Sequence, residues 1–107
     1  MQNPYREEQP IFKGQYNLIT EDNEFRMSLW VRGFGINDAE GNEVLPLMRS
    51  LNLDDFEEIG NLLKVKFKIF PNGAKQYEAE INPFTKTFTF NNQTIALDKF
   101  KEMFKEI

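Results

Sequence analysis

Three lysines occupy every second position between residues 64 and 68, in the sequence Lys-Val-Lys-Phe-Lys. In an extended strand successive side chains point to opposite faces, so Lys64, Lys66 and Lys68 form a ladder on one face. No acidic residue occurs from Ile59 through Tyr77, although the chain carries a formal net charge of −4. A stripe of ammonium groups is suited to contact an anion such as a phosphate. An ordinary solvated strand face accounts for the same pattern.

A second candidate site lies in the segment 25–34, where two aromatic residues and two arginines are interleaved at the even-numbered positions. Alternation predicts that the odd-numbered residues from 25 to 31 face the core and that the even-numbered ones face outward. Bases of single-stranded nucleic acids stack on aromatic rings, and cations contact their phosphates. Alternatively, the tryptophan packs beneath the C-terminal helix or the N-terminal arm, with the arginines extending to solvent. The outward residues suited to nucleic acid are Arg26, Trp30, Arg32 and Phe34.

The residue types that usually perform catalysis are missing or badly placed. The chain has no histidine and no cysteine, and neither Ser28 nor Ser50 lies in a Gly-x-Ser-x-Gly motif. Four carboxylates between residues 54 and 58 fit the first turn of a helix, where anions are stabilised. We therefore expect a protein that is not an enzyme and that uses no metal or cofactor. The four carboxylates belong to Asp54, Asp55, Glu57 and Glu58.

Most of the chain has the two-residue period of strands, with polar turns between them. A turn is predicted at 21–23 and a tight Asn-Gly hairpin at 71–73. The period becomes helical in two windows, 53–60 and 98–107. The second window has four apolar residues spaced i, i+3, i+4 and i+7, which predicts a helix that docks on the domain or on a second copy. These residues are Phe100, Met103, Phe104 and Ile107. The predicted strands cover 11–20, 24–34, 43–48, 64–70, 76–82, 84–90 and 94–97.

The order of these elements predicts an α+β, β-rich fold with a short middle helix and a C-terminal helix. A small barrel or a strongly curved antiparallel sheet accommodates three strands, a helix and two further strands, as in the OB-fold. A pleckstrin-homology-like barrel closed by its C-terminal helix explains the order almost as well. Residues 1–10 are polar and predict a flexible N-terminal arm, which leaves 11–107 as a single domain.

Composition sets further limits on the class of protein. A hydrophobic content of 40% and eleven phenylalanines exclude a wholly disordered chain. No apolar run approaches the roughly 20 residues that span a bilayer, and the polar first ten residues do not resemble a secretory signal. We therefore expect a cytoplasmic protein that does not contact membranes.

The segment from Asn3 to Val31 resembles the beginning of small proteins encoded by phages and mobile elements. The resemblance rests on the sequences Pro-Ile-Phe-Lys-Gly at 10–14 and Phe-Arg-Met-Ser-Leu-Trp at 25–30. It covers less than a third of the chain. It implies a role in single-stranded DNA binding or replication, and it implies that Trp30 and its neighbours carry that role.

Three hypotheses about function follow from these patterns. The leading one is a non-enzymatic module that binds single-stranded nucleic acid on a barrel face, through the aromatic and arginine row and the lysine ladder. The second is a protein-protein inhibitor or adaptor of the anti-defence or immunity type, since such proteins are often small, acidic and poor in cysteine. The third is a structural component that forms homo-oligomers through an exposed strand or the C-terminal helix.

Overall fold

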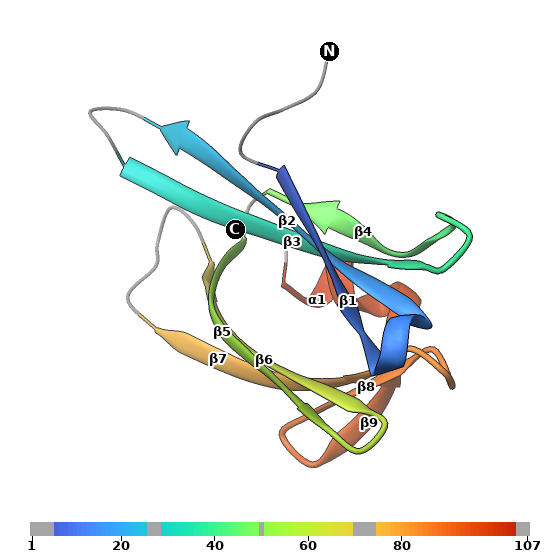
Figure 1. Ribbon diagram of the computed structural model, residues 1–107. Helices are drawn as coiled ribbons and strands as arrows, with labels where there is room; N and C mark the ends of the chain where they lie inside the picture. The colour runs from blue at the N-terminus through green and yellow to red at the C-terminus, as the bar shows by residue number, and fades with distance from the viewer. Residues whose placement is uncertain (1–5, 26–28, 50, 70–74, 105–107) are drawn as a thin grey trace.

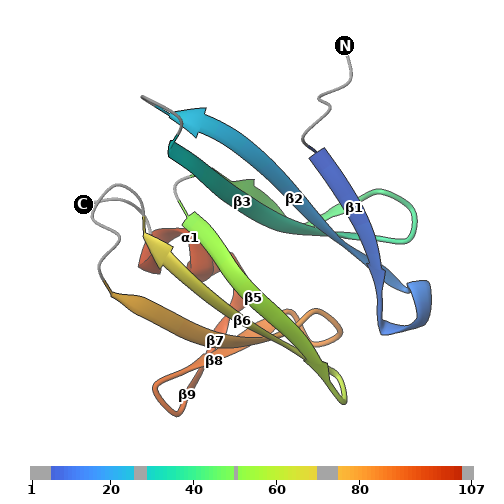
Figure 2. The same cartoon turned by 60° about the vertical axis from the view of Figure 1, so that its left-hand side comes forward.

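Alternating polar and apolar residues fold this chain into two antiparallel sheets that pack face to face (Figures 1 and 2). The computed structural model describes residues 6–25, 29–49, 51–69 and 75–104. Strands that follow one another in the sequence are also neighbours within each sheet. Both sheets are therefore meanders, and their inner faces enclose the core.

Each sheet is built from one half of the chain. The first sheet contains β1 (Arg6–Ile11), β2 (Tyr16–Phe25), β3 (Leu29–Asp38) and β4 (Glu43–Met48). The second sheet contains β5 (Leu51–Ile59), β6 (Leu62–Ile69), β7 (Gln76–Asn82), β8 (Thr87–Phe90) and β9 (Gln93–Ala96). The helical segments are η1 (Phe12–Gly14), η2 (Leu97–Lys99) and α1 (Phe100–Met103).

Aromatic side chains fill the space between the sheets. Phe34 of β3, Phe67 of β6 and Phe88 of β8 are each at most 1% exposed. Phe100 of α1 contacts all three, at ring-centroid distances of 6.3, 5.9 and 4.8 Å respectively. Phe104, just after α1, is 2% exposed and lies 4.8 Å from Phe100. The end of the chain therefore acts as a wedge that joins the two sheets, as Figures 1 and 2 show for α1.

The window 53–60, predicted as a helix, is instead part of strand β5. The ladder between β5 and β6 shifts register after Leu53, which lies opposite Phe67, while Phe56 lies opposite Val65. Phe67 and Val65 are fully buried, so Leu53 and Phe56 share the inner side although they are three residues apart. A β-bulge inserts one extra residue and produces this spacing. The helical prediction is wrong because the bulge imitates a helical period.

The polar turn predicted at 21–23 lies inside β2. Its two acidic side chains are held by arginines, one from the neighbouring strand β3 and one that directly follows β4. Glu21 is 4% exposed and accepts a hydrogen bond from Nε of Arg49 at 2.7 Å. Asp22 accepts one from Nε of Arg32 at 2.8 Å. These ion pairs allow polar residues to occupy the middle of a strand.

Two glycines of β3 let β4 approach closely. A Cβ atom on Gly33 would lie 2.7 Å from the carbonyl oxygen of Met48. A Cβ atom on Gly35 would lie 2.7 Å from the carbonyl oxygen of Leu45 and 2.8 Å from the amide nitrogen of Leu47. These are backbone atoms of β4, which is irregular in register along this contact. The path of β4 therefore requires glycine at both positions.

The β-rich, antiparallel character and the C-terminal helix of the predicted fold are confirmed, whereas the closed barrel is not. Among the described strands, no ladder joins the first sheet to the second. The OB-like and pleckstrin-homology-like alternatives are therefore not confirmed. No helix in the described part of the chain is long and apolar enough to cross a membrane.

The two ends of the domain also differ from expectation. Arg6–Ile11 form β1 and pair with β2, whereas residues 1–10 were expected to form a flexible arm. Residues 1–5 lie outside the described part of the chain. Of the helix predicted at 98–107, the described residues form η2 and α1, which together span Leu97–Met103. Residues 105–107 lie outside the described part of the chain.

Candidate functional site

The lysine ladder has the predicted geometry on β6. Val65 and Phe67 are fully buried, while Lys64, Lys66 and Lys68 lie on the opposite face and are partly exposed. The extended, alternating structure of this segment is therefore confirmed. We call the surface that carries the lysines the outer face of the second sheet.

Carboxylates from both neighbouring strands oppose this ladder. Lys64 and Lys66 each lie opposite one acidic residue of β5 and one of β7. Nζ of Lys64 is 3.5 Å from Oε2 of Glu78, and Nε2 of Gln76 donates a hydrogen bond to Asp54 at 2.9 Å across β6. The lysines thus have no acidic neighbours along the sequence, but carboxylates of the adjacent strands lie beside them in the sheet. The carboxylates of this face belong to Asp54, Asp55, Glu57, Glu78 and Glu80.

The four residues predicted to form an aromatic and arginine surface do not share one in the described structure. Phe34 is fully buried between the sheets, so the prediction that it faces outward is wrong. Phe34 and Ile36 face the core from the even-numbered side of β3, whereas Arg32 on that side is exposed and Val31 on the other side is buried, as predicted. Arg26 and the side chain of Trp30 lie outside the part of the chain that the structure describes.

Arg32 is exposed, but a carboxylate already pairs with it. Its Nε donates to Oδ1 of Asp22 at 2.8 Å, and its side chain is 51% exposed. This hydrogen bond to Asp22 raises the pKa of Arg32 further above its usual value. The backbone N–H of Arg32 also donates to Oδ1 of Asn52 on β5, at 2.9 Å. Arg32 therefore holds β2 and β5 in place rather than presenting a free cation.

Only two of the four residues in the predicted apolar stripe of the C-terminal helix are shown to be buried. Phe100 is buried against both sheets and Phe104 against the second sheet, whereas Met103 is 43% exposed. Ile107 lies outside the described residues. In the described part of the chain, this helix docks through its two phenylalanines.

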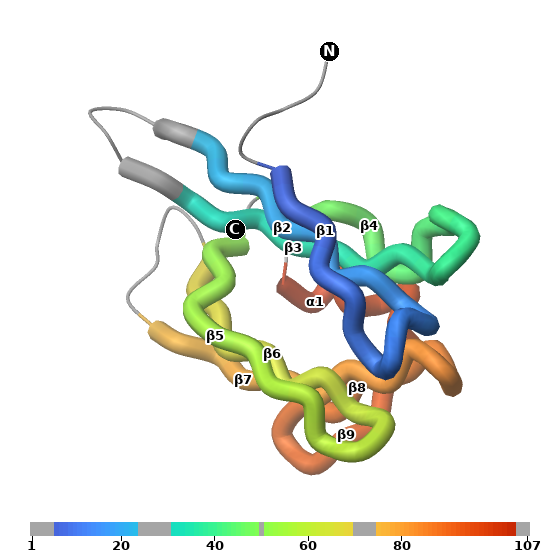
Figure 3. The backbone as a smooth tube through the Cα atoms, in the orientation of Figure 1, coloured from blue at the N-terminus to red at the C-terminus, as the bar shows by residue number. Residues whose placement is uncertain are grey.

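A groove that the sequence did not indicate runs beside the first half of β7. The ladder between β7 and β8 extends only from Glu80 to Asn82, because β8 ends at Phe90 and the chain turns back into β9. Figure 3 shows the β8–β9 hairpin beside one end of β7 only. From Gln76 to Ala79, β7 pairs with β6 on one side, and none of the described strands pairs with it on the other. We call this hollow of about 440 Å³ the β7 edge groove, and its lining residues are 75–80 and 89–92.

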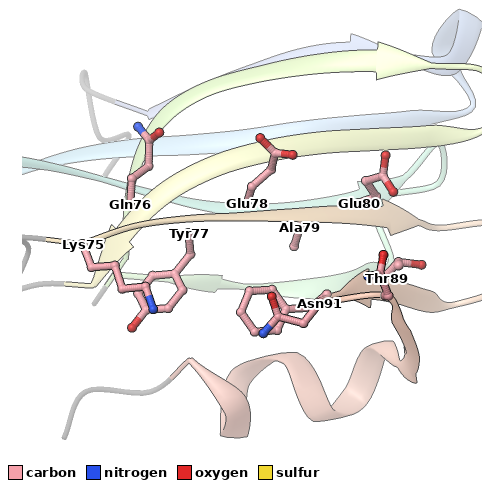
Figure 4. Close-up of a pocket in the computed structure, with 10 residues that line it drawn as sticks. Lys75, Gln76, Tyr77, Glu78, Ala79, Glu80, Thr89 and Asn91 are labelled. Carbon is pink, nitrogen blue, oxygen red and sulfur yellow. The ribbon is translucent and has the colours of Figure 1, made fainter.

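Two chemically different sides border the β7 edge groove (Figure 4). Gln76, Glu78 and Glu80 point to the outer face of the second sheet, while Tyr77 points toward α1. This alternation follows from the two-residue period of β7. A ligand along the strand would therefore meet carboxylates on one side and an aromatic surface on the other.

The aromatic side of the groove is formed by the rings of Tyr77 and Phe90, which pack against the buried ring of Phe104. The ring of Tyr77 lies 6.1 Å from that of Phe90 and 5.8 Å from that of Phe104. Tyr77 and Phe90 are half-buried, so part of each ring stays accessible. Nζ of Lys75 lies 5.1 Å above the centre of the Tyr77 ring, within the range of a cation–π interaction. We call Tyr77, Phe90 and Phe104 the aromatic cluster.

Asparagines at both ends keep β8 short. Oδ1 of Asn82 accepts hydrogen bonds from the backbone N–H groups of Phe84 and Thr85, at 3.0 and 3.2 Å, which starts a turn. Asn91 and Asn92 both adopt positive φ, at 52° and 64°. Asparagine tolerates this conformation and bonds to nearby backbone groups, so it favours turns at both places.

The sequence did not reveal the groove because it does not set the register of β8 against β7. In the observed register Thr89 lies opposite Glu80 and β8 ends at Phe90, so it stops before residues 76–78 of β7. The signal that could have found the groove was Asn91-Asn92, where positive φ turns the chain away from β7.

The described residues contain no group of three or more acidic side chains placed to hold a metal ion. Comparison of the chain with models of protein families found no match. Searches of curated proteins and of solved structures found no significant match either. Only the residues and their geometry therefore bear on function.

Proposed function

We propose that this protein is a non-enzymatic protein-binding module, acting as an adaptor or inhibitor, that takes an extended segment of its partner as an added strand along β7. The open edge from Gln76 to Ala79, with the groove beside it, carries this proposal. An open edge offers main-chain N–H and C=O groups to a peptide, and pockets for alternate side chains select it. At about 3.3 Å per residue, the four open residues span roughly 13 Å, enough for a short strand.

The other described edges are protected against such pairing in ways that proteins commonly use. β1 is rich in charge and includes Pro10, and β4 contains Pro46 and is irregular in register. β5 has four carboxylates along its length, and β9 has only the four residues Gln93–Ala96. The β7 edge combines an unpaired backbone with a groove, which supports its role as the binding edge.

Nucleic-acid binding stays a prediction with weaker support. Affinity for phosphates depends on cations that are free to neutralise them. On the outer face of the second sheet five carboxylates outnumber the three lysines, and Arg32 and Arg49 are each paired with a carboxylate. Phe34 is buried, so it cannot stack on a base in this structure. These observations favour a protein partner.

Amide hydrogen exchange on the whole protein, followed by NMR, tests the proposal. The probes are three end-blocked peptides: the sequence of residues 64–69, and two versions of it in which glutamate or serine replaces the three lysines. Within a sheet, the main-chain groups of successive residues alternate between the two neighbouring strands. Binding should therefore slow exchange at two amides, two residues apart, between Gln76 and Ala79.

The amides in the middle of β2, which pairs with strands on both sides, serve as the internal control and should not change. The proposal fails if none of the three peptides slows exchange between residues 76 and 79. It also fails if a DNA strand of about 20 nucleotides binds at low salt while all three peptides do not.

A further inference from the structure

Building on the proposed function, we infer that the segment bound along β7 is cationic, with a basic residue opposite Glu78 and apolar residues opposite Tyr77 and Ala79. The partner is thus a protein whose exposed, extended segment alternates basic and apolar residues. This inference rests on the charges of the groove, on its aromatic cluster and on the strand that β7 already pairs with.

A basic side chain opposite Glu78 would lie within reach of two carboxylates. Residues opposite each other in a ladder have Cβ atoms about 4.5–5.5 Å apart, and long side chains also reach the diagonal neighbour. That neighbour is Glu80, on the same side of β7. Glu78 is 50% exposed, and the 3.5 Å contact with Lys64 leaves its carboxylate room for another donor. Glu80 takes part in none of the three ion pairs found among the described residues.

The charge of the surrounding surface selects the same kind of segment. The outer face of the second sheet has five carboxylates and three lysines, so it repels an anionic strand and attracts a cationic one. The net charge of −4 on the whole chain also attracts a cationic segment at long range.

The opposite side of the groove suits apolar side chains. A residue opposite Tyr77 would lie against the aromatic cluster, where Tyr77 and Phe90 have rings 6.1 Å apart and partly accessible. The next residue on this side of β7 is the apolar Ala79, which lines the groove and is 1% exposed. A segment with apolar residues at both positions would bury these exposed ring surfaces.

The chain's own β6 shows which pattern this strand accepts on its paired edge. Lys66 lies opposite Glu78, and Phe67 lies opposite Tyr77. The rings of Phe67 and Tyr77 are stacked, with centroids 6.0 Å apart and planes inclined by 24°. A bound segment that alternates basic and apolar residues would repeat these contacts on the open edge.

The three peptides described above test this inference by their relative affinities, measured by NMR titration. The lysine peptide should bind at least about ten-fold more tightly than the glutamate peptide at low salt, and salt should reduce this preference because the charges are exposed. Glu78→Gln should weaken binding of the lysine peptide about two- to five-fold, the usual contribution of an exposed ion pair. The same variant should leave binding of the serine peptide unchanged.

A matched control is Glu40→Gln, which removes the same charge from an exposed turn of the first sheet and should leave all affinities unchanged. Circular dichroism checks that both variants are folded. If all three peptides slow exchange at residues 76–79 with equal affinity, the cationic preference is overturned while the protein-binding function stands. If no peptide binds, the proposed function itself fails. If exchange at these residues slows with protein concentration alone, the occupant is a second copy and the cationic partner is overturned.

Discussion

Replacing Phe100 with alanine should remove the wedge that joins the two sheets. Phe100 is fully buried in α1, and its ring contacts Phe34 of the first sheet and Phe67 and Phe88 of the second. Its ring also lies 4.8 Å from that of Phe104. The substitution leaves a cavity at the place where the sheets meet, and alanine keeps the helical propensity of α1 high.

The expected loss of stability can be estimated from these contacts. Truncating a buried phenylalanine to alanine typically costs about 3–5 kcal/mol, because a lost transfer free energy adds to the cost of a cavity. A domain of this length has a total stability of roughly 5–15 kcal/mol. At about 4 °C per kcal/mol, Phe100→Ala should therefore lower Tm by roughly 12–20 °C.

Urea unfolding followed by circular dichroism measures this loss of stability. An unchanged m-value indicates that the variant exposes the same amount of surface on unfolding as the original protein. The matched control is Met103→Ala, on the same helix but at a position that is 43% exposed, and it should cost less than about 1 kcal/mol. If both variants lose the same small amount of unfolding free energy, the helix does not act as a wedge between the sheets. If Phe100→Ala does not fold, Phe100→Leu keeps much of the volume and should give a smaller, measurable loss.

Two further substitutions test other parts of the structure. Gly35→Ala should destabilise the protein by about 1–3 kcal/mol, because the new Cβ would lie 2.7 Å from a backbone oxygen of β4, and an unchanged Tm would contradict this account. Hydrogen bonds from backbone N–H groups, that of Asn42 foremost, lower the pKa of Asp38 below its ordinary value of 3.8. Asp38 therefore stabilises the folded state above about pH 4, and this contribution is lost as the pH falls through its lowered pKa. Asp38→Asn should lower Tm near neutral pH by more than it does near pH 2, and a constant difference in calorimetry at both pH values would refute the assignment.

Local patterns in the sequence were enough to predict several strands closely. The expected strands 43–48 and 76–82 coincide with β4 and β7, and the alternation of Lys64 to Lys68 on β6 is as expected. A strand's two-residue period is a property of the chain itself and does not depend on its neighbours. Pro46 likewise suited an edge strand, which β4 is.

Other features depended on partner strands and were predicted wrongly. Leu53 and Phe56 have a helical spacing, but a bulge against β6 places both on the inner side of β5. Phe34 was assigned to the outer face because the two faces of β3 cannot be distinguished until the opposing sheet is known. The ion pair between Glu21 and Arg49 explains why an acidic residue lies inside β2 rather than in a turn.

The sequence by itself determined that the chain is rich in antiparallel strands, that β6 has one basic and one apolar face, and that a helix follows the last strand. Only the tertiary structure decided the electrostatic character of the basic face, because Lys66 meets Asp55 and Glu78 across two ladders rather than along the chain. It also decided where β7 lacks a neighbour, since that depends on where β8 ends relative to β7. Strand register is set by packing between segments far apart in sequence, and so are the surfaces that register creates.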